Sequence, residues 1–391
     1  MSRFLNQRVQ TIKPSGIRKF FNLASEMSDV ISLGVGEPDF DTPWHVRDEA
    51  IYSIQEGRTF YTANAGLLEL RQAIANNIRR LQGVVYQPES EVLVTIGGSE
   101  AIDLVFRACL EPGDEVIYTE PCYVSYLPCI QLMDGVPVPI SLKEENQFRL
   151  TRDELAAAIT DKTKILVLSF PNNPTGAVMT KEDLEGIADL IIEHDLLVIT
   201  DEIYDRLTYN DQEDHVSIIS LPGMQERTIY INGFSKAYAM TGWRLGYCAG
   251  PAEILQQMTK IHQFTIMAAP TMSQYAGLEA IRHAEGEVLE MRESYNQRRR
   301  YLLSELDRLG IPCFEPLGAF YIFPNISQFG LTSEDFAMQL LEDQRVAVVP
   351  GSAFGDSGEG FIRISYAYSI AELKLALERI EKFIYKLRGD K

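Results

Sequence analysis

The sequence lacks the features that mark several common classes of protein. Its five cysteines are odd in number and include no CxxC pair, which argues against a disulfide framework or a zinc site. The five histidines are scattered without a metal-ligand spacing such as HExxH, so we expect no metal. Neither GxGxxG nor GxxxxGK occurs, so the two common nucleotide-binding motifs are missing as well.

Long apolar segments and an excess of positive charge are also missing. The N-terminal stretch MSRFLNQRVQTIKPSG has no apolar core of a signal peptide, and no run approaches the roughly 18 residues of a membrane span. We therefore expect a cytoplasmic protein that does not enter membranes. The 36 Lys and Arg residues against 55 Asp and Glu residues leave a net charge of −19, which would repel nucleic acid. This balance still permits a local basic pocket for a small anion.

What is present predicts a large α/β core. Hydrophobic residues make up 46% of the 391 residues, which is too many for a disordered chain. Short apolar runs alternate with helical patterns, and strands buried on both faces with helical crossovers predict a mostly parallel seven-stranded sheet. One amphipathic helix, with apolar residues from Leu67 to Leu81 spaced three and four apart, precedes this sheet. The runs are Val92–Ile96, Val116–Tyr118, Val136–Ile140, Ile165–Phe170, Leu196–Thr200, Thr228–Ile231 and Leu245–Ala249.

The pattern changes after about residue 271. A long helical stretch rich in Glu and Arg runs to Leu309 and stops at Gly310, with Pro312 beyond. The segments that follow indicate a separate α+β unit. We therefore predict a large domain at residues 46–282 and a smaller, discontinuous domain formed by residues 1–45 and 283–391. The segments of that unit are strand-like 319–323, helical 334–342, strand-like 346–349 and 361–365, and a final helix from residue 370.

Polar residues follow five successive strands of the predicted sheet. Ligands of parallel α/β sheets bind at the carboxyl ends of the strands, so these residues should meet at one edge. Taken singly, the Gly98–Ser99 segment could be a plain turn, Tyr123 a core tyrosine, Asp201 part of an ion pair and Lys236 a solvated lysine. Together those explanations are hard to sustain. The five strands deliver the Gly98–Ser99 turn as an anion cradle, Tyr123, Asn173 within the rigid PNNPTG loop, Asp201 and Lys236, with Arg244 eight residues further on.

This combination of groups predicts a particular cofactor. A lysine becomes a nucleophile toward a carbonyl when desolvation or nearby positive charge lowers its pKa. A cofactor with an aldehyde, a phosphate and a ring nitrogen that needs an anionic partner would use every one of these groups. Pyridoxal 5′-phosphate is that cofactor, because it requires a Schiff-base lysine and an acidic partner for its pyridinium nitrogen.

The sequence resembles the class I/II pyridoxal-phosphate-dependent aminotransferases, which have the PLP-dependent transferase fold of aspartate aminotransferase. The resemblance covers nearly the whole chain, and within the family it is closer to the prokaryotic branch of aromatic-amino-acid and thermophile-type aspartate aminotransferases. Any one of the shared segments would be weak evidence, but their combination is specific. They are SLGVGEPDF at 32–40, YTANAGLLELR at 61–71, PNNPTG at 171–176, DEIY at 201–204, SKAYAMTGWRLGY at 235–247, GAFYIFP at 318–324, VVPGSAFG at 348–355 and FIRISYA at 361–367.

The resemblance implies roles for matching residues around the cofactor ring. Lys236 would form the Schiff base and then carry the proton lost from the substrate α-carbon. Asp201 would pair with the ring nitrogen, and Asn173 and Tyr204 would hydrogen-bond the ring's phenolate oxygen. Tyr123 would stack on the ring, although it departs from the Trp of aspartate enzymes.

The resemblance also implies how phosphate and substrate are held. The phosphate would rest on Gly98 and Ser99, with Ser235 and Arg244 in support; Gly233 departs from the phosphate-binding Ser of many relatives. Tyr61 would reach the phosphate of the neighbouring subunit, which implies a homodimer. The substrate α-carboxylate would be held by Arg363 as a bidentate fork, assisted by the backbone N–H of Gly36.

The substrate side chain is the least determined feature. Aspartate enzymes of this branch have Lys in place of Ser99 and Thr in place of Ile17, whereas the apolar Ile17 resembles the N-terminal segment of aromatic-using relatives. We therefore expect aromatic or other bulky neutral amino acids as donors and 2-oxoglutarate as acceptor. An aspartate or acyl-diaminopimelate aminotransferase, a carbon–sulfur lyase on the same cofactor site, and a regulatory module with an aminotransferase-like domain remain alternatives.

Overall fold

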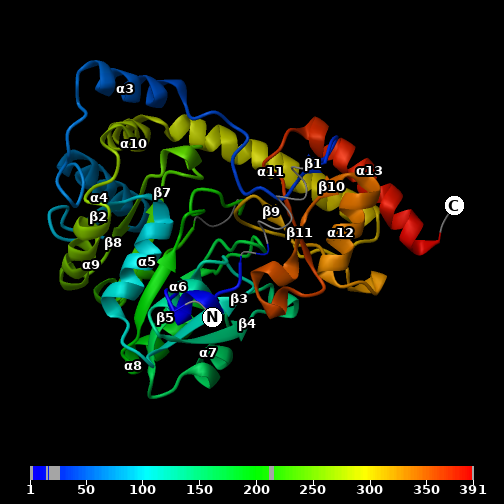
Figure 1. The fold of residues 1–391 in the computed structure, drawn as a ribbon, viewed down its shortest axis with the longest axis horizontal. Helices are drawn as coiled ribbons and strands as arrows, with labels where there is room; N and C mark the ends of the chain where they lie inside the picture. The colour runs from blue at the N-terminus through cyan, green and yellow to red at the C-terminus, as the bar shows by residue number, and fades with distance from the viewer. Residues whose placement is uncertain (1–2, 15, 17–26, 211–214, 390–391) are drawn as a thin grey trace.

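A computed structural model describes residues 3–14, 16, 27–210 and 215–389. Its centre is a seven-stranded sheet with the order β2-β8-β7-β6-β5-β3-β4 (Figure 1). Only β8 runs antiparallel to its neighbours, so the predicted mostly parallel sheet is confirmed. The strands are β2 (Val92–Thr95), β3 (Glu115–Glu120), β4 (Val136–Ser141), β5 (Thr163–Ser169), β6 (Leu197–Asp201), β7 (Thr228–Gly233) and β8 (Gly246–Ala249).

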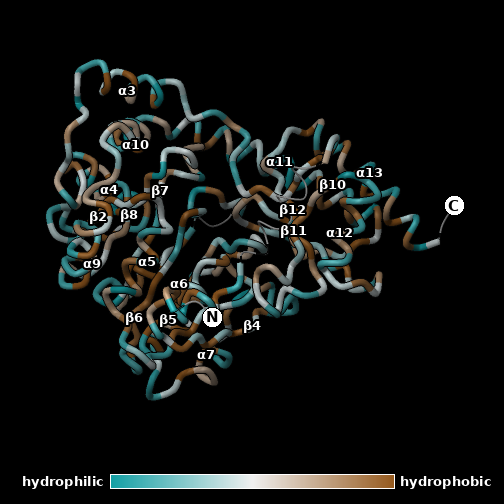
Figure 2. The backbone as a smooth tube through the Cα atoms, in the orientation of Figure 1, coloured by the Kyte–Doolittle hydropathy of each residue, from teal (hydrophilic) through white to brown (hydrophobic). Residues whose placement is uncertain are grey.

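Alternate residues of these strands pack on opposite faces of the sheet. Ile165 and Val167 of β5 belong to the cluster beneath one layer of helices, whereas Leu166 and Leu168 belong to the cluster on the other face. The apolar tint of the central strands in Figure 2 reflects this burial on both sides. One face is covered by α5 (Gly97–Cys109), α6 (Tyr126–Leu132) and α9 (Ala252–Thr265), and the other by α4 (Leu68–Gln82), α7 (Arg152–Ala158), α8 (Lys181–Glu193) and α10 (Thr271–His283), with α3 (Trp44–Gln55) packed against α10.

Two smaller sheets lie beside the large one, at the right of Figure 1. A segment near the N-terminus pairs in parallel with the C-terminal part of the chain, and Leu33 N donates to Ala347 O at 2.8 Å. The domain limits, 46–282 for the large domain and 1–45 with 283–391 for the small one, remain a prediction. The elements are β1 (Ile31–Ser32) with β10 (Val346–Ala347), the sheet of β11 (Val349–Pro350), β12 (Ile362–Ser365) and β9 (Tyr321–Ile322), and the helices α11 (Glu285–Arg308), α12 (Ser333–Gln344) and α13 (Ile370–Arg388).

Three predicted segments have different limits in the structure: a helical stretch and one strand are divided, and another strand is shorter. The long helical stretch is two helices, α10 and α11, because the backbone leaves helical geometry at Ala284. The strand at 319–323 shortens to β9 since Ala319 has a positive φ of 58°, and the strand at 346–349 splits between two sheets on either side of Val348. None of the helices in the described ranges is long and apolar enough to cross a bilayer. The remaining short elements are α1 (Gln7–Thr11) and the 3₁₀ turns Glu144–Asn146, Ile218–Ser220, Gln225–Arg227, Thr241–Trp243, Ser327–Phe329, Gly351–Phe354 and Asp356–Gly358.

Candidate active site

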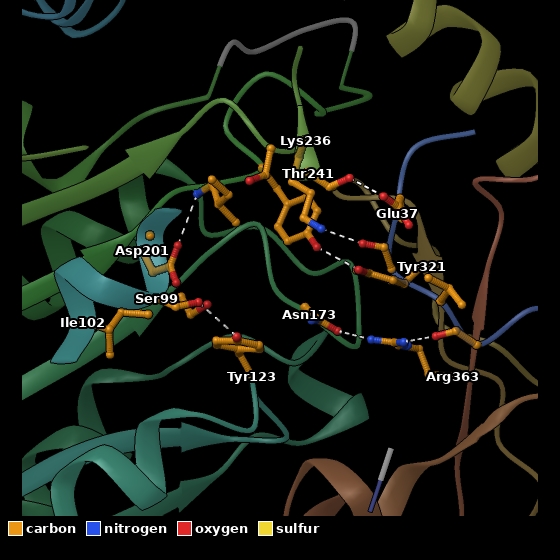
Figure 3. A pocket seen from close by; sticks show the side chains of 18 of the residues that line it. Glu37, Ser99, Ile102, Tyr123, Asn173, Asp201, Lys236, Thr241, Tyr321 and Arg363 are labelled. Atoms are coloured by element: carbon orange, nitrogen blue, oxygen red, sulfur yellow. Dashed lines mark hydrogen bonds between the residues drawn. The ribbon is translucent and has the colours of Figure 1, made fainter. Parts of the chain in front are cut away.

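A cavity of about 380 Å³ lies at the carboxyl edge of the large sheet, where side chains from distant parts of the chain converge (Figure 3). Nearly all the predicted site residues line it. Tyr61 does not; 82% of this residue is exposed on the surface of this chain. Ile17 lies outside the described residues. The predicted residues that line the cavity are Gly36, Gly98, Ser99, Tyr123, Asn173, Asp201, Tyr204, Ser235, Lys236, Arg244 and Arg363.

Lys236 is held at the centre of this cavity. It follows β7, and its Nζ donates to Gly36 O at 2.5 Å. Burial, together with the positive charges of Arg363 and Arg244, lowers the pKa of Lys236 to about 8, although Glu37 and Asp201 act in the opposite direction. About a tenth of this amine is therefore neutral, and hence nucleophilic, at pH 7.

Asp201 ends β6 with its carboxylate facing the cavity and only 7% of the residue exposed. Its Oδ2 accepts a hydrogen bond from the hydroxyl of Tyr126 at 2.8 Å, and the backbone N–H of Ile203 donates to Oδ1 at 3.3 Å. Burial raises the pKa of Asp201, while these hydrogen bonds and the charge of Lys236 oppose the rise. A cationic partner in the cavity would favour the ionised carboxylate.

An anion cradle forms where β2 turns into α5. Gly97 has a φ of +72°, and a Cβ built there would lie 2.6 Å from Nη2 of Arg244. This places the guanidinium against the first turn of the helix, whose backbone N–H groups lack partners within the helix. At the predicted departure, Gly233, a Cβ would lie 3.0 Å from Cα of Gly246, so the backbones meet closely here.

Arg363 belongs to β12 and lies on the wall of the cavity opposite the anion cradle. Only 3% of the residue is exposed. Its Nη1 donates to Oδ1 of Asn173 at 2.8 Å, and its Nη2 donates to Gly34 O. Among the described residues, no acceptor lies within hydrogen-bonding distance of its buried Nε. Burial lowers the pKa of Arg363, with Tyr321 and Tyr204 acting in the opposite direction. A buried guanidinium with donor capacity left can take a carboxylate.

Sequence reasoning missed three residues that contribute to the site. Tyr126 contacts Asp201, Glu37 accepts a hydrogen bond from Thr241 at the cavity rim, and Tyr321 lines the cavity beside Arg363. Glu37 and Tyr321 lie within the segments GVGEPDF and GAFYIFP, which were singled out without a role for these side chains. The one available signal for Tyr126 is its position three residues after Tyr123.

The family model of class I and II aminotransferases matches residues 28–380 of the sequence. The chain belongs to this family. The match covers most of the 391 residues, including every described residue of the cavity, and the predicted family is thereby confirmed.

Individual aminotransferases share nearly the full length of the chain. An aspartate aminotransferase of Pyrococcus abyssi is 46% identical over 382 residues, which cover 97% of this chain and 98% of the relative. The aromatic-amino-acid aminotransferase 2 of Thermococcus litoralis is 44% identical, again over 97% of this chain and 98% of the relative. The crystal structure of an aromatic aminotransferase from Pyrococcus horikoshii superimposes with a TM-score of 0.90 at 47% identity, covering 95% of this chain and 99% of that one.

The protein is therefore an aminotransferase, and its family depends on pyridoxal 5′-phosphate. The site fits that cofactor in three respects. Asp201 is a buried carboxylate, Lys236 is an amine with a lowered pKa, and Arg244 stands beside a helix turn in which Gly97 leaves the backbone open. These groups suit a ring nitrogen, an aldehyde and a phosphate respectively.

Proposed function

We propose that this aminotransferase moves the amino group of an aromatic or bulky neutral L-amino acid to 2-oxoglutarate, with Lys236 as the lysine that carries the cofactor. The role of Lys236 is supported most strongly by its buried amine at the edge of the sheet, whose lowered pKa of about 8 suits attack on an aldehyde. When bound, the cofactor supplies an electron sink for negative charge at the substrate α-carbon. Lys236 Nζ then accepts the proton that the α-carbon loses.

The surrounding residues bind and orient in this proposal. Asp201 remains ionised against the cofactor's ring nitrogen, and Tyr126 orients its carboxylate by the hydrogen bond at Oδ2. Asn173 and Tyr204 donate to the ring oxygen, and Tyr123 covers the ring face. Arg363 holds the substrate α-carboxylate, and the backbone N–H of Gly36 assists. The phosphate lies in a cradle made of Gly98, Ser99, Ser235 and Arg244.

Preference for a neutral side chain is supported by the cavity wall near α5. That wall presents the hydroxyl of Ser99, the side chain of Ile102 and the ring of Tyr123, and none of these is cationic. The hydroxyl oxygens of Ser99 and Tyr123 lie 3.3 Å apart and form a hydrogen bond. Arg244 lies against the first turn of the same helix, but in this proposal it pairs with the cofactor phosphate. A substrate carboxylate facing this wall would therefore lose solvation without gaining a charged partner of its own, which is costly.

A panel of donors with 2-oxoglutarate tests the preference. Phenylalanine and tyrosine should have higher kcat/KM than aspartate, and Ser99→Lys should shift the ratio toward aspartate by about tenfold because it adds a charge-assisted hydrogen bond. Ser304→Lys, which adds the same charge on an exposed face of α11, should leave the ratio unchanged. If aspartate is the better donor of the unmodified enzyme, the proposed substrate class is wrong. Release of pyruvate or ammonia without 2-oxoglutarate would favour a lyase instead.

We also propose a homodimer in which Tyr61 serves the neighbouring active site. The segment that carries Tyr61 is anchored to its own chain, since Thr271 Oγ1 donates to Phe60 O at 2.7 Å. Yet the residues Phe60 and Tyr61 are 81% and 82% exposed. Phe264 of α9 is 82% exposed as well, and the two segments are linked, since Asn64 Nδ2 donates to Met267 O at 2.8 Å. Large exposed apolar residues of this kind are typical of an interface between protein chains.

Subunit mixing tests this arrangement. Tyr61→Ala and Lys236→Ala should each be nearly inactive alone. If Tyr61 acts across the interface, each hybrid dimer regains one intact site, and random mixing restores about a quarter of the wild-type sites. If Tyr61 acts within its own chain, mixing the two variants restores no activity, and the shared-site proposal is overturned.

A further inference from the structure

Tyr321 is the most buried tyrosine of the cavity wall, with 1% of the residue exposed. It comes from β9, in the same small sheet as Arg363, whereas Tyr204 follows β6 of the large sheet. The hydroxyls of Tyr321 and Tyr204 lie 2.7 Å apart and form a hydrogen bond in which either can be the donor. This contact links the small sheet to the segment that follows β6 of the large sheet, within the cavity.

The ring of Tyr321 supports a second residue of the site. The guanidinium carbon of Arg363 lies 4.3 Å from the centre of the ring, which is the geometry of a cation–π contact. The position of the ring also constrains the opposite backbone. A Cβ built on Gly36 would lie 2.2 Å from the Tyr321 hydroxyl, so no larger residue fits at 36 without displacing this tyrosine.

The number of hydroxyl protons on the two tyrosines indicates what the hydroxyl of Tyr321 does. Tyr204 has a single hydroxyl proton, and its described hydrogen-bond partner is Tyr321. When the Tyr204 hydroxyl donates its hydrogen bond to an acceptor in the cavity, its oxygen can still accept a hydrogen bond. The Tyr321 hydroxyl is placed to donate that hydrogen bond. A hydroxyl that accepts a hydrogen bond is a better donor, because hydrogen bonds in a chain polarise one another.

We infer that Tyr321 is a positioning residue that acts through two neighbours. Its hydroxyl turns the Tyr204 proton toward the ring oxygen of the cofactor, and its ring holds the Arg363 guanidinium in place for the substrate carboxylate. This inference rests on the proposed function, which assigns those tasks to Tyr204 and Arg363. The charged and titratable groups near the two tyrosines are Arg363, Asp201, Tyr123 and Lys236, whose Nζ lies 5.9 Å from the centre of the Tyr204 ring.

The hydroxyl is tested with Tyr321→Phe, which keeps the ring. A donor to an anionic oxygen favours the ionised form, so weakening it raises the pKa at which the visible band of the holoenzyme titrates. We expect that midpoint to move upward, and kcat to fall by about 2- to 10-fold, the effect of one ordinary hydrogen bond. KM should stay nearly constant because the ring remains under Arg363.

Two further variants distinguish an error in the inference about Tyr321 from an error in the role proposed for Tyr204. Tyr204→Phe should raise the midpoint more than Tyr321→Phe does. Tyr366→Phe removes an equally buried hydroxyl, which donates to Ala319 O at 3.1 Å, and should leave the midpoint unchanged. If Tyr204→Phe shifts the midpoint and Tyr321→Phe does not, the inference about Tyr321 is overturned while the proposed function stands. If Tyr204→Phe has no effect either, the role proposed for Tyr204 is wrong and the inference falls with it.

The ring is tested with Tyr321→Leu. Binding of 3-phenylpropionate, an unreactive carboxylate, is read from the change that it causes in the visible band of the holoenzyme. We expect Kd to rise several-fold in Tyr321→Leu and to stay within about twofold of wild type in Tyr321→Phe, since only the former loses the cation–π contact. Equal binding by wild type and both variants overturns the supporting role of the ring. Weaker binding by Tyr321→Phe as well would place that role on the hydroxyl instead.

Discussion

Amine reactivity of the cofactor-free enzyme gives a direct measure of the environment of Lys236. The pKa of Lys236 is lowered from 10.5 to about 8, first by burial and then by the charge of Arg363. At pH 7 a lysine with this pKa is neutral in about 9% of molecules, against about 0.03% for an ordinary lysine. The neutral amine should therefore be about 300-fold more abundant at this position than on the protein surface.

The assay follows arylation of the amine by trinitrobenzenesulfonate as a function of pH. The difference between the wild-type protein and Lys236→Ala isolates the signal of Lys236. Because its pKa is lowered, the rate should rise through a midpoint near 8, well below the range of the other lysines. A midpoint at or above 10 would refute the reasoning from burial and charge.

Removing one nearby negative charge tests the direction of the electrostatic effect on the pKa of Lys236 in the same assay. Glu37 raises the pKa of Lys236 and forms a hydrogen bond with Thr241 at the rim of the cavity. Glu37→Gln keeps the shape of the side chain and removes its negative charge, so the midpoint should fall below that of the wild type. A midpoint that moves upward in this variant would show that the electrostatic argument has the wrong sign.

Two further predictions concern the carboxylate site and the anion cradle. Arg363→Lys keeps the charge but loses the bidentate fork, so kcat/KM should fall by about 10- to 150-fold, and an unchanged value would exclude Arg363 as the carboxylate ligand. Gly97→Ala places a Cβ 2.6 Å from Arg244 Nη2 at a positive φ and should weaken the binding of pyridoxal 5′-phosphate, as measured by equilibrium titration of the cofactor-free enzyme. Gly186→Ala in α8, where a Cβ meets nothing within 4 Å, is the control and should bind the cofactor like the wild type; equal affinity in both variants would contradict the cradle.

Much of the fold was predictable because buried strands have a plain signature. A strand covered on both faces must be apolar throughout, and all seven apolar runs coincide with strands of the large sheet. Six of these strands are mostly buried, whereas the seventh, β4, lies at the sheet edge and is largely exposed or half-buried. Strand direction was not predictable in the same way. The apolar pattern of β8 reads identically in both directions, so its antiparallel pairing with β2 and β7 became visible only in the structure.

The sequence by itself determined which chemical groups reach the edge of the sheet. Asp201 is the last residue of β6, and Asn173 and Lys236 lie four and three residues after the ends of β5 and β7. Because parallel strands end at a common edge, the proximity of these residues follows from local order along the chain. The same logic could not find residues that arrive from elsewhere in the fold. Tyr321 reaches Tyr204 from a different sheet, and no spacing in the sequence encodes that contact.

Tertiary structure alone decided how these groups are tuned. The lowered pKa of Lys236 depends on burial and on Arg363, which comes from β12 of the small sheet, and the orientation of Asp201 depends on Tyr126 of α6. Electrostatic energy and hydrogen bonding depend on distances of a few ångströms in space and on the exclusion of water. Residue types along the chain therefore identify the chemistry, whereas the folded arrangement sets the protonation and direction of each group.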